Sequence, residues 1–238
     1  AAKTTALDQG KTVYLSSANY PPFYGEDLKD QGPVTQIVKE ACAKVFYDVE
    51  VQFHPWARSE QLAQNCEVDG MFPPWDKPSR RVWGIFSDPI PPANEIGFYK
   101  RKDDLIVFKA FENNLKIGVV RGYANPAVFE LSGMERVVSN SDLHNLKLLL
   151  DKRADLVLID KILAKYLIET ELESQHQNKL VWMEPAIDIS NQHLVICKNA
   201  TNAYKLVAQF NEGLKLITET RLVDKILRKH GLNTTPRE

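Results

Sequence analysis

The sequence contains few cysteines and no long apolar segment. Only three of its 238 residues are cysteine, and none of them forms a CxxC pair or a Cys/His cluster with metal-binding spacing. No apolar run approaches the roughly 18–20 residues that a helix needs to cross a bilayer. We therefore expect no metal site, no cofactor and no transmembrane helix.

An excess of positive charge is also missing. Thirty lysines and arginines stand against 31 aspartates and glutamates, whereas proteins that bind the phosphate backbone need a basic surface. We therefore expect no nucleic-acid partner. The chain does not open with a basic and then apolar export signal. It opens with the small polar segment Ala1–Thr5, and we expect that a signal peptide was removed.

The three cysteines are interpreted as small buried apolar residues. Cys42 lies on the apolar face of a predicted helix, and Cys197 lies in an alternating, strand-like segment. With Cys66 they allow at most one internal disulfide. Such a bond would favour the periplasm, but the spacing does not establish it.

The first third of the chain alternates between strand and helix patterns. The predicted elements are a strand at Thr12–Ser16, a helix at Val34–Val45, a strand at Val49–Phe53, a helix at Ser59–Gln64 and a strand at Val68–Phe72. This order predicts a parallel sheet with helices on its faces.

The middle of the chain repeats this order. Strands are predicted at Lys116–Val120, Arg136–Val138 and Asp155–Ile159, with helices at Asn125–Leu131, after the cap Ser141-Asp142, and after Asp160. The chain then returns through Val181 and His193–Lys198 and ends in one or two helices. We expect an α/β protein with two lobes, residues 1–93 with 193–238 and residues 94–192. Pro89–Pro92 and Asp188–Gln192 are the predicted crossing segments.

Aromatic and charged side chains follow the predicted strands. In open α/β sheets, ligands bind beyond the carboxyl ends of the strands. The candidate ligand-binding residues there are Tyr20, Trp56, Arg58, Trp75, Arg80, Gly122, Tyr123 and Asp160. This composition suits a small polar ligand with an apolar part. Ser-His-Asp, paired-glutamate and metal motifs are missing, so we expect no catalytic residue and no enzymatic activity.

Several short motifs resemble the family 3 extracellular solute-binding proteins, the receptors of amino-acid ABC transporters. The motifs are Tyr20–Phe23, Val68–Phe72, Arg80, Phe86–Ile90, Ile117–Gly122 and Arg153–Asp160, in the order that the family shows. The resemblance implies a type II periplasmic-binding-protein fold. In this fold two lobes, each a mostly parallel sheet flanked by helices, are joined by two crossing segments. It also implies a periplasmic monomer that closes on a small ligand and meets a membrane ABC permease or a sensor.

The resemblance also implies roles for individual residues. Arg80 would bind a ligand α-carboxylate through its guanidinium fork, and Asp160 would hold the α-ammonium. Tyr20 and Trp56 would stack on the ligand, and the backbone after Gly122 would supply N–H donors.

Several residues depart from the family pattern or have a second interpretation. Pro73, Pro74, Asp76 and Tyr123 replace residues that relatives use for binding, which predicts a modified pocket. Arg80 and Arg58 could be surface charges, Asp160 could be a helix N-cap, and Tyr20, Trp56 and Trp75 could belong to the core.

Two other functions remain open. The first is an enzyme on the same fold, similar to cyclohexadienyl or arogenate dehydratases, which would need a placed acid or base. The second is a sensory module of a signalling protein, which would use the same ligand site.

Overall fold

The computed structural model describes residues 11–106 and 115–232, so the segment Ala1–Thr5 lies outside the described residues. The chain divides into two compact units. The first unit contains Ala1–Ala93 and Asn191–Glu238, and the second contains Asn94–Ser190. The chain therefore passes from one unit to the other twice.

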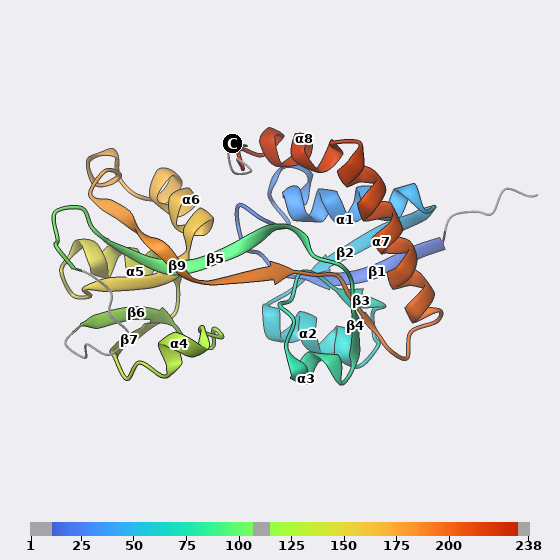
Figure 1. Cartoon of the computed structure of the whole chain (residues 1–238), viewed down its shortest axis with the longest axis horizontal. Helices are drawn as coiled ribbons and strands as arrows, with labels where there is room; N and C mark the ends of the chain where they lie inside the picture. Colours follow the sequence, from blue (N-terminus) through green and yellow to red (C-terminus); the bar gives the residue numbers. More distant parts are fainter. Residues whose placement is uncertain (1–10, 107–114, 233–238) are drawn as a thin grey trace, which may run out of the picture. The chain divides into compact units, whose positions relative to one another are not determined.

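The first unit is built on a five-stranded sheet with the order β2-β1-β3-β10-β4, and Figure 1 shows β2 beside β1. Its strands are β1 (Lys11–Ser17), β2 (Tyr47–Phe53), β3 (Gly70–Met71), β4 (Gly84–Phe86) and β10 (Val195–Cys197). Strand β1 runs parallel to β2 and β3, and Leu15 lies opposite both Val51 and Gly70. Strand β10 comes from the last part of the chain and pairs antiparallel with β3 and β4. The predicted parallel order of the first three strands is confirmed.

The third strand is shorter than the predicted Val68–Phe72. Only Gly70 and Met71 form β3, because these two residues lie between β1 and the short strand β10. Gly70 permits this close pairing, since a side chain at that position would collide with the carbonyl oxygen of Val195. Its neighbours Asp69 and Phe72 still donate single backbone hydrogen bonds to β1.

Helices cover this sheet. They are η1 (Lys29–Gln31), α1 (Pro33–Lys44), α2 (Trp56–Gln64), α3 (Pro78–Arg81), α7 (Ala203–Glu219) and α8 (Leu222–Lys229). Helix α1 buries the apolar face predicted from its spacing, including Val34, Ile37 and Val38. Helix α7 packs along α1 (Figure 1). Gly213 allows this close approach, because a Cβ there would overlap the carbonyl oxygen of Ala41.

The second unit contains a sheet with the order β7-β6-β8-β5-β9, and Figure 1 shows β7 beside β6. Its strands are β5 (Ile90–Arg101), β6 (Lys116–Val120), β7 (Glu135–Ser139), β8 (Leu156–Asp160) and β9 (Leu180–Gln192), and its helices are α4 (Ala127–Glu130), α5 (Asp142–Leu150), α6 (Lys161–Glu171) and η2 (Ser174–His176). Strands β7, β6 and β8 are parallel, and β5 pairs antiparallel with β8. Every residue of β8 is buried, as expected for a parallel strand covered on both faces. The predicted α/β class is confirmed.

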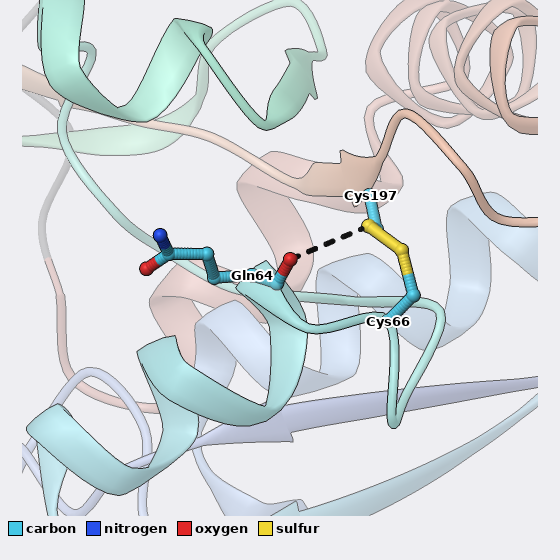
Figure 2. Close-up of a disulfide and its surroundings, with 3 residues drawn as sticks. All are labelled: Gln64, Cys66 and Cys197. Atoms are coloured by element: carbon cyan, nitrogen blue, oxygen red, sulfur yellow. Dashed lines mark hydrogen bonds between the residues drawn. A yellow bond between two sulfur atoms is a disulfide. The ribbon is translucent and has the colours of Figure 1, made fainter.

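Two of the three cysteines form a disulfide, so their interpretation as separate buried residues was wrong. Cys66, which follows α2, bonds to Cys197 at the end of β10, and their Cα atoms lie 5.6 Å apart. Figure 2 shows the bond, with the Cys197 sulfur 3.8 Å from the carbonyl oxygen of Gln64. The cysteines are 131 residues apart, so only the return of β10 to this sheet brings them together. Cys42 remains a free, buried thiol.

None of the described helices is both long and apolar enough to cross a membrane.

Candidate ligand-binding site

The predicted aromatic residues of the first unit follow the carboxyl ends of adjacent parallel strands. Tyr20 follows β1, Trp56 begins helix α2 after β2, and Trp75 follows β3. Tyr20 stacks on Phe23 and Tyr24, with ring centroids 5.8 and 5.7 Å apart. Strand order therefore brings the three predicted aromatic positions to one edge of the sheet.

Arg80 lies on α3 at this edge, and the protein itself binds its guanidinium. The Nε atom donates a hydrogen bond of 2.8 Å to Glu60 Oε1, and Nη2 donates to Glu60 Oε2 at 3.4 Å. The Nη1 atom donates to the backbone carbonyl of Trp75 at 3.0 Å. The Trp56 ring packs against the guanidinium, with its centroid 5.7 Å from the Arg80 Cζ atom. The side chain predicted to bind a ligand carboxylate is thus already paired with a carboxylate of the chain.

Glu60 was not predicted as a site residue. It follows Trp56 by four residues on α2, so both side chains lie on the same face of the helix. The side chain of Glu60 is 27% exposed, whereas that of Arg80 is 11% exposed. The sequence offered the spacing of Trp56 and Glu60 as a signal. That Glu60 pairs with Arg80 on α3 could be learned only from the fold.

Two other charged residues near this edge have partners inside the chain. Arg58 is exposed on α2 and donates to Gln61 Oε1 at 3.4 Å. Asp76 accepts a hydrogen bond of 2.7 Å from Arg81 Nε. This bond lowers the pKa of Asp76, against a smaller opposing effect of burial. Asp76 therefore adds less uncompensated negative charge than its position in the sequence suggested.

Asp160 ends β8 in the second unit and is 2% exposed. Its Oδ1 atom accepts from the backbone N–H of Leu163 at 2.8 Å, which makes it the N-cap of α6. Its Oδ2 atom accepts from the Asn94 side-chain amide at 3.0 Å. Burial raises the pKa of Asp160 from 3.8 to about 7, although both hydrogen bonds oppose this shift, and the charge of nearby Asp142 adds a smaller increase.

A second buried carboxyl group, Asp142, follows β7 at the start of α5. Its Oδ2 atom accepts a hydrogen bond of 2.9 Å from the hydroxyl of Tyr123. Burial raises the pKa of Asp142 from 3.8 to about 6, while the Tyr123 hydrogen bond lowers it. Because the carboxyl ends of β6, β7 and β8 lie at one edge, the structure brings Tyr123, Asp142 and Asp160 into one region. Asp142 was predicted only as part of a helix cap, so its place in the site was missed.

The backbone after β6 makes a tight turn. Gly122 has a φ of +81°, a conformation that favours glycine. The N–H of Tyr123 donates to the carbonyl of Val120 at 3.2 Å. This turn uses the Tyr123 N–H, while the prediction that the backbone after Gly122 supplies N–H donors to a ligand stays a prediction. Among residues 11–106 and 115–232, no group of three or more His, Cys, Asp or Glu side chains is placed to hold a metal ion.

The sequence matches the model of the bacterial extracellular solute-binding proteins, family 3, over residues 13–233. The chain belongs to this family. The match covers both units, so the two-lobed periplasmic-binding-protein fold predicted from the motifs is confirmed. A comparison with curated proteins found no significant match.

Solved structures of solute-binding and sensor proteins have the same fold as this family 3 chain. A histidine kinase sensor domain with similarity to periplasmic binding proteins is 17% identical, with a TM-score of 0.72, and the match covers 94% of this chain and 97% of that one. The GluR0 ligand-binding core from Nostoc punctiforme, in complex with L-glutamate, is 12% identical with a TM-score of 0.73, covering 93% and 100%. The substrate-binding protein of an amino acid ABC transporter is 17% identical with a TM-score of 0.70, covering 92% and 98%.

Proposed function

We propose that this protein is a periplasmic receptor that captures a small, amino-acid-like ligand by hinge closure and delivers it to a membrane ABC permease. The observation that carries the proposal is the buried carboxyl group of Asp160. Its hydrogen-bond donors, the side-chain amide of Asn94 and the backbone N–H groups of Leu163 and Ile162, are neutral. Within the described part of the chain, no lysine or arginine forms an ion pair with it.

A buried carboxyl group without a cationic partner suits an ammonium ligand. Removing an ionised carboxylate from water is unfavourable unless a cation and hydrogen bonds compensate. The pKa of Asp160, raised by burial to about 7, reflects this missing compensation. A ligand ammonium would supply the charge, and Asp142 would add to the attraction. The proposed role of Asp160 is therefore to hold the amino group of the ligand.

The first unit would bind the remainder of the ligand. Tyr20, Trp56 and Trp75 are the proposed contacts for its apolar part, since aromatic rings provide large, rigid contact surfaces. Arg80 orients this region together with Glu60. The other three predicted ligand contacts remain part of the proposal. Arg58 is exposed at the same edge of the first unit, whereas Gly122 and Tyr123 belong to the second unit.

Thermal unfolding with a ligand panel tests the proposal. A ligand that binds only the folded state raises its stability by about 2.7 kcal/mol at a hundredfold excess over Kd. We expect amines and amino-acid derivatives to stabilise the protein, and Asp160→Asn to abolish this effect. Asp151→Asn, which changes an exposed aspartate of the same unit, should respond as wild type does. The proposal fails if no compound of the panel stabilises the wild-type protein.

Two further measurements test hinge closure and oligomeric state. Small-angle scattering should show a smaller radius of gyration at saturating ligand, because closure brings the two units together. Light scattering after size exclusion should give the mass of a monomer. An unchanged radius would contradict closure.

The Cys66–Cys197 disulfide supports a location in the periplasm, because such bonds persist in oxidising compartments. Alkylation of free cysteines, in protein prepared from the cell envelope, measures whether Cys66 and Cys197 are bonded to each other in the cell. Only Cys42 should react after denaturation.

A second candidate function is ligand sensing for a signalling protein. The likeness to a histidine kinase sensor domain favours it, with a TM-score of 0.72. The same ligand site would serve either role, so the ligand panel does not separate them. Co-purification with an ABC permease supports transport, whereas co-purification with a kinase or cyclase supports sensing.

A further inference from the structure

The ion pair between Glu60 and Arg80 changes what the first unit presents to a ligand. Glu60 takes the Nε and Nη2 edge of the guanidinium, the Trp75 carbonyl takes Nη1, and the Trp56 ring covers one face. Arginine binds carboxylates most strongly through two parallel N–H donors. One such pair of donors is therefore already used by a carboxylate from helix α2.

Glu60 is the more exposed partner of this ion pair. The Glu60 side chain is 27% exposed and the Arg80 side chain 11%. Each carboxylate oxygen of Glu60 can accept more hydrogen bonds than the one that Arg80 supplies. The more exposed partner of the pair is therefore an acceptor with unused hydrogen-bonding capacity.

A ligand carboxylate at Arg80 would have to displace Glu60 or lie next to it. Displacement would break a partly buried ion pair, and juxtaposition would bring two like charges together, which disfavours binding. Lys77 is another cation near the pair. Burial lowers the pKa of Lys77, the charge of Arg80 lowers it further, and Glu60 opposes both effects.

We propose that Glu60 is a specificity-determining residue, which excludes ligands with a free carboxylate and selects primary amines and amino-acid amides. This inference rests on the proposed function, because the ligand amino group is still held by Asp160. Glu60 then provides a second acceptor, suited to an amide N–H or to another ammonium group. The preferred ligand keeps the amino group and side chain of an amino acid but lacks its acid group.

Matched pairs of ligands test the inference by titration calorimetry. The pairs are tryptophan and tryptamine, arginine and agmatine, and leucine and leucinamide, in which only the carboxylate is removed or neutralised. For at least one pair, we expect the wild-type protein to bind the amine or amide about tenfold more tightly or better than the acid. In Glu60→Gln, binding of the acid should improve, and this ratio should fall towards one.

Two variants control for indirect effects. Glu67→Gln removes an exposed negative charge from the same unit and should keep the wild-type ratio. Arg80→Gln leaves Glu60 in place, so this variant should still prefer amines, even if Glu60→Gln proves too unstable to measure. Loss of acid binding alone in Arg80→Gln would instead identify Arg80 as a carboxylate anchor and overturn the inference.

The remaining outcomes separate this inference from the proposed function. If the wild-type protein binds amino acids as tightly as their amides, or if Glu60→Gln leaves the ratio unchanged, Glu60 does not determine specificity, while the receptor function stands. If the wild-type protein binds neither class of compound, both the inference and the proposed receptor function are wrong.

Discussion

Replacement of Asp160 by asparagine should make the protein more stable at neutral and alkaline pH. Burial raises the pKa of this carboxyl group from 3.8 to about 7. Between these two values the folded protein holds a proton that the unfolded chain has released. The contribution of this group to the free energy of unfolding should therefore be most favourable below pH 4. It should decrease as the pH rises towards 7 and stay constant above that value.

The size of the effect follows from the shift. A rise of about three pKa units, at about 1.4 kcal/mol per unit, corresponds to a loss of about 4 kcal/mol across this pH window. Asparagine carries no charge, and its side-chain oxygen can still accept the Leu163 N–H as an N-cap. Asp160→Asn should therefore lose most of this pH dependence while it keeps helix α6.

Urea unfolding at a series of pH values between 4.5 and 8.5 provides the assay. The difference in free energy of unfolding between Asp160→Asn and wild type should increase with pH. Burial also raises the pKa of Asp142, to about 6. The stability of the Asp160→Asn variant should therefore still decrease somewhat with rising pH. Asp151→Asn serves as the matched exposed control and should follow the wild-type curve. The reasoning is refuted if wild type and Asp160→Asn lose stability equally with rising pH.

Three further predictions concern ligand binding, the disulfide and helix packing. An amine should bind more tightly as the pH rises from 6 to 8 and should release a proton on binding, because Asp160 must ionise to hold it; calorimetry in buffers of different ionisation enthalpy measures this release, and pH-independent binding would contradict it. Replacing Cys66 and Cys197 by serine should lower the free energy of unfolding by about 2–5 kcal/mol, because the bond closes a loop across 131 residues; unchanged urea midpoints would be the contrary result. Gly213→Ala should destabilise the protein by about 1–3 kcal/mol, because its methyl group would overlap the Ala41 carbonyl; thermal unfolding measures it, and an unchanged melting temperature would argue against tight packing of α1 and α7.

Local patterns predicted most of the secondary structure of this chain. Strand β6 has the predicted bounds, and Ser141 caps α5 by accepting a hydrogen bond from the His144 N–H, as expected. Both depend on residues close together in the sequence. Alternation, helical spacing and capping are local properties, and they also carried the resemblance to the family.

The partners of the site residues were harder to predict. The family motif identified Arg80 and Asp160 as candidates, but it did not show that Glu60 pairs with one and that Asp142 lies near the other. Glu60 and Arg80 are 20 residues apart, on different helices. Their contact depends on how α2 and α3 pack at the edge of the sheet.

The sequence by itself determined the α/β class, the order of strands and helices, and the positions at strand ends where a ligand site can form. Only the tertiary structure decided that Cys66 meets Cys197 and that Glu60 neutralises Arg80. It also showed that Asp160 is buried with a raised pKa. The physical reason is that periodicity and capping arise between neighbours in the chain. Ion pairing, disulfide formation and desolvation instead depend on distances between residues that only folding brings together.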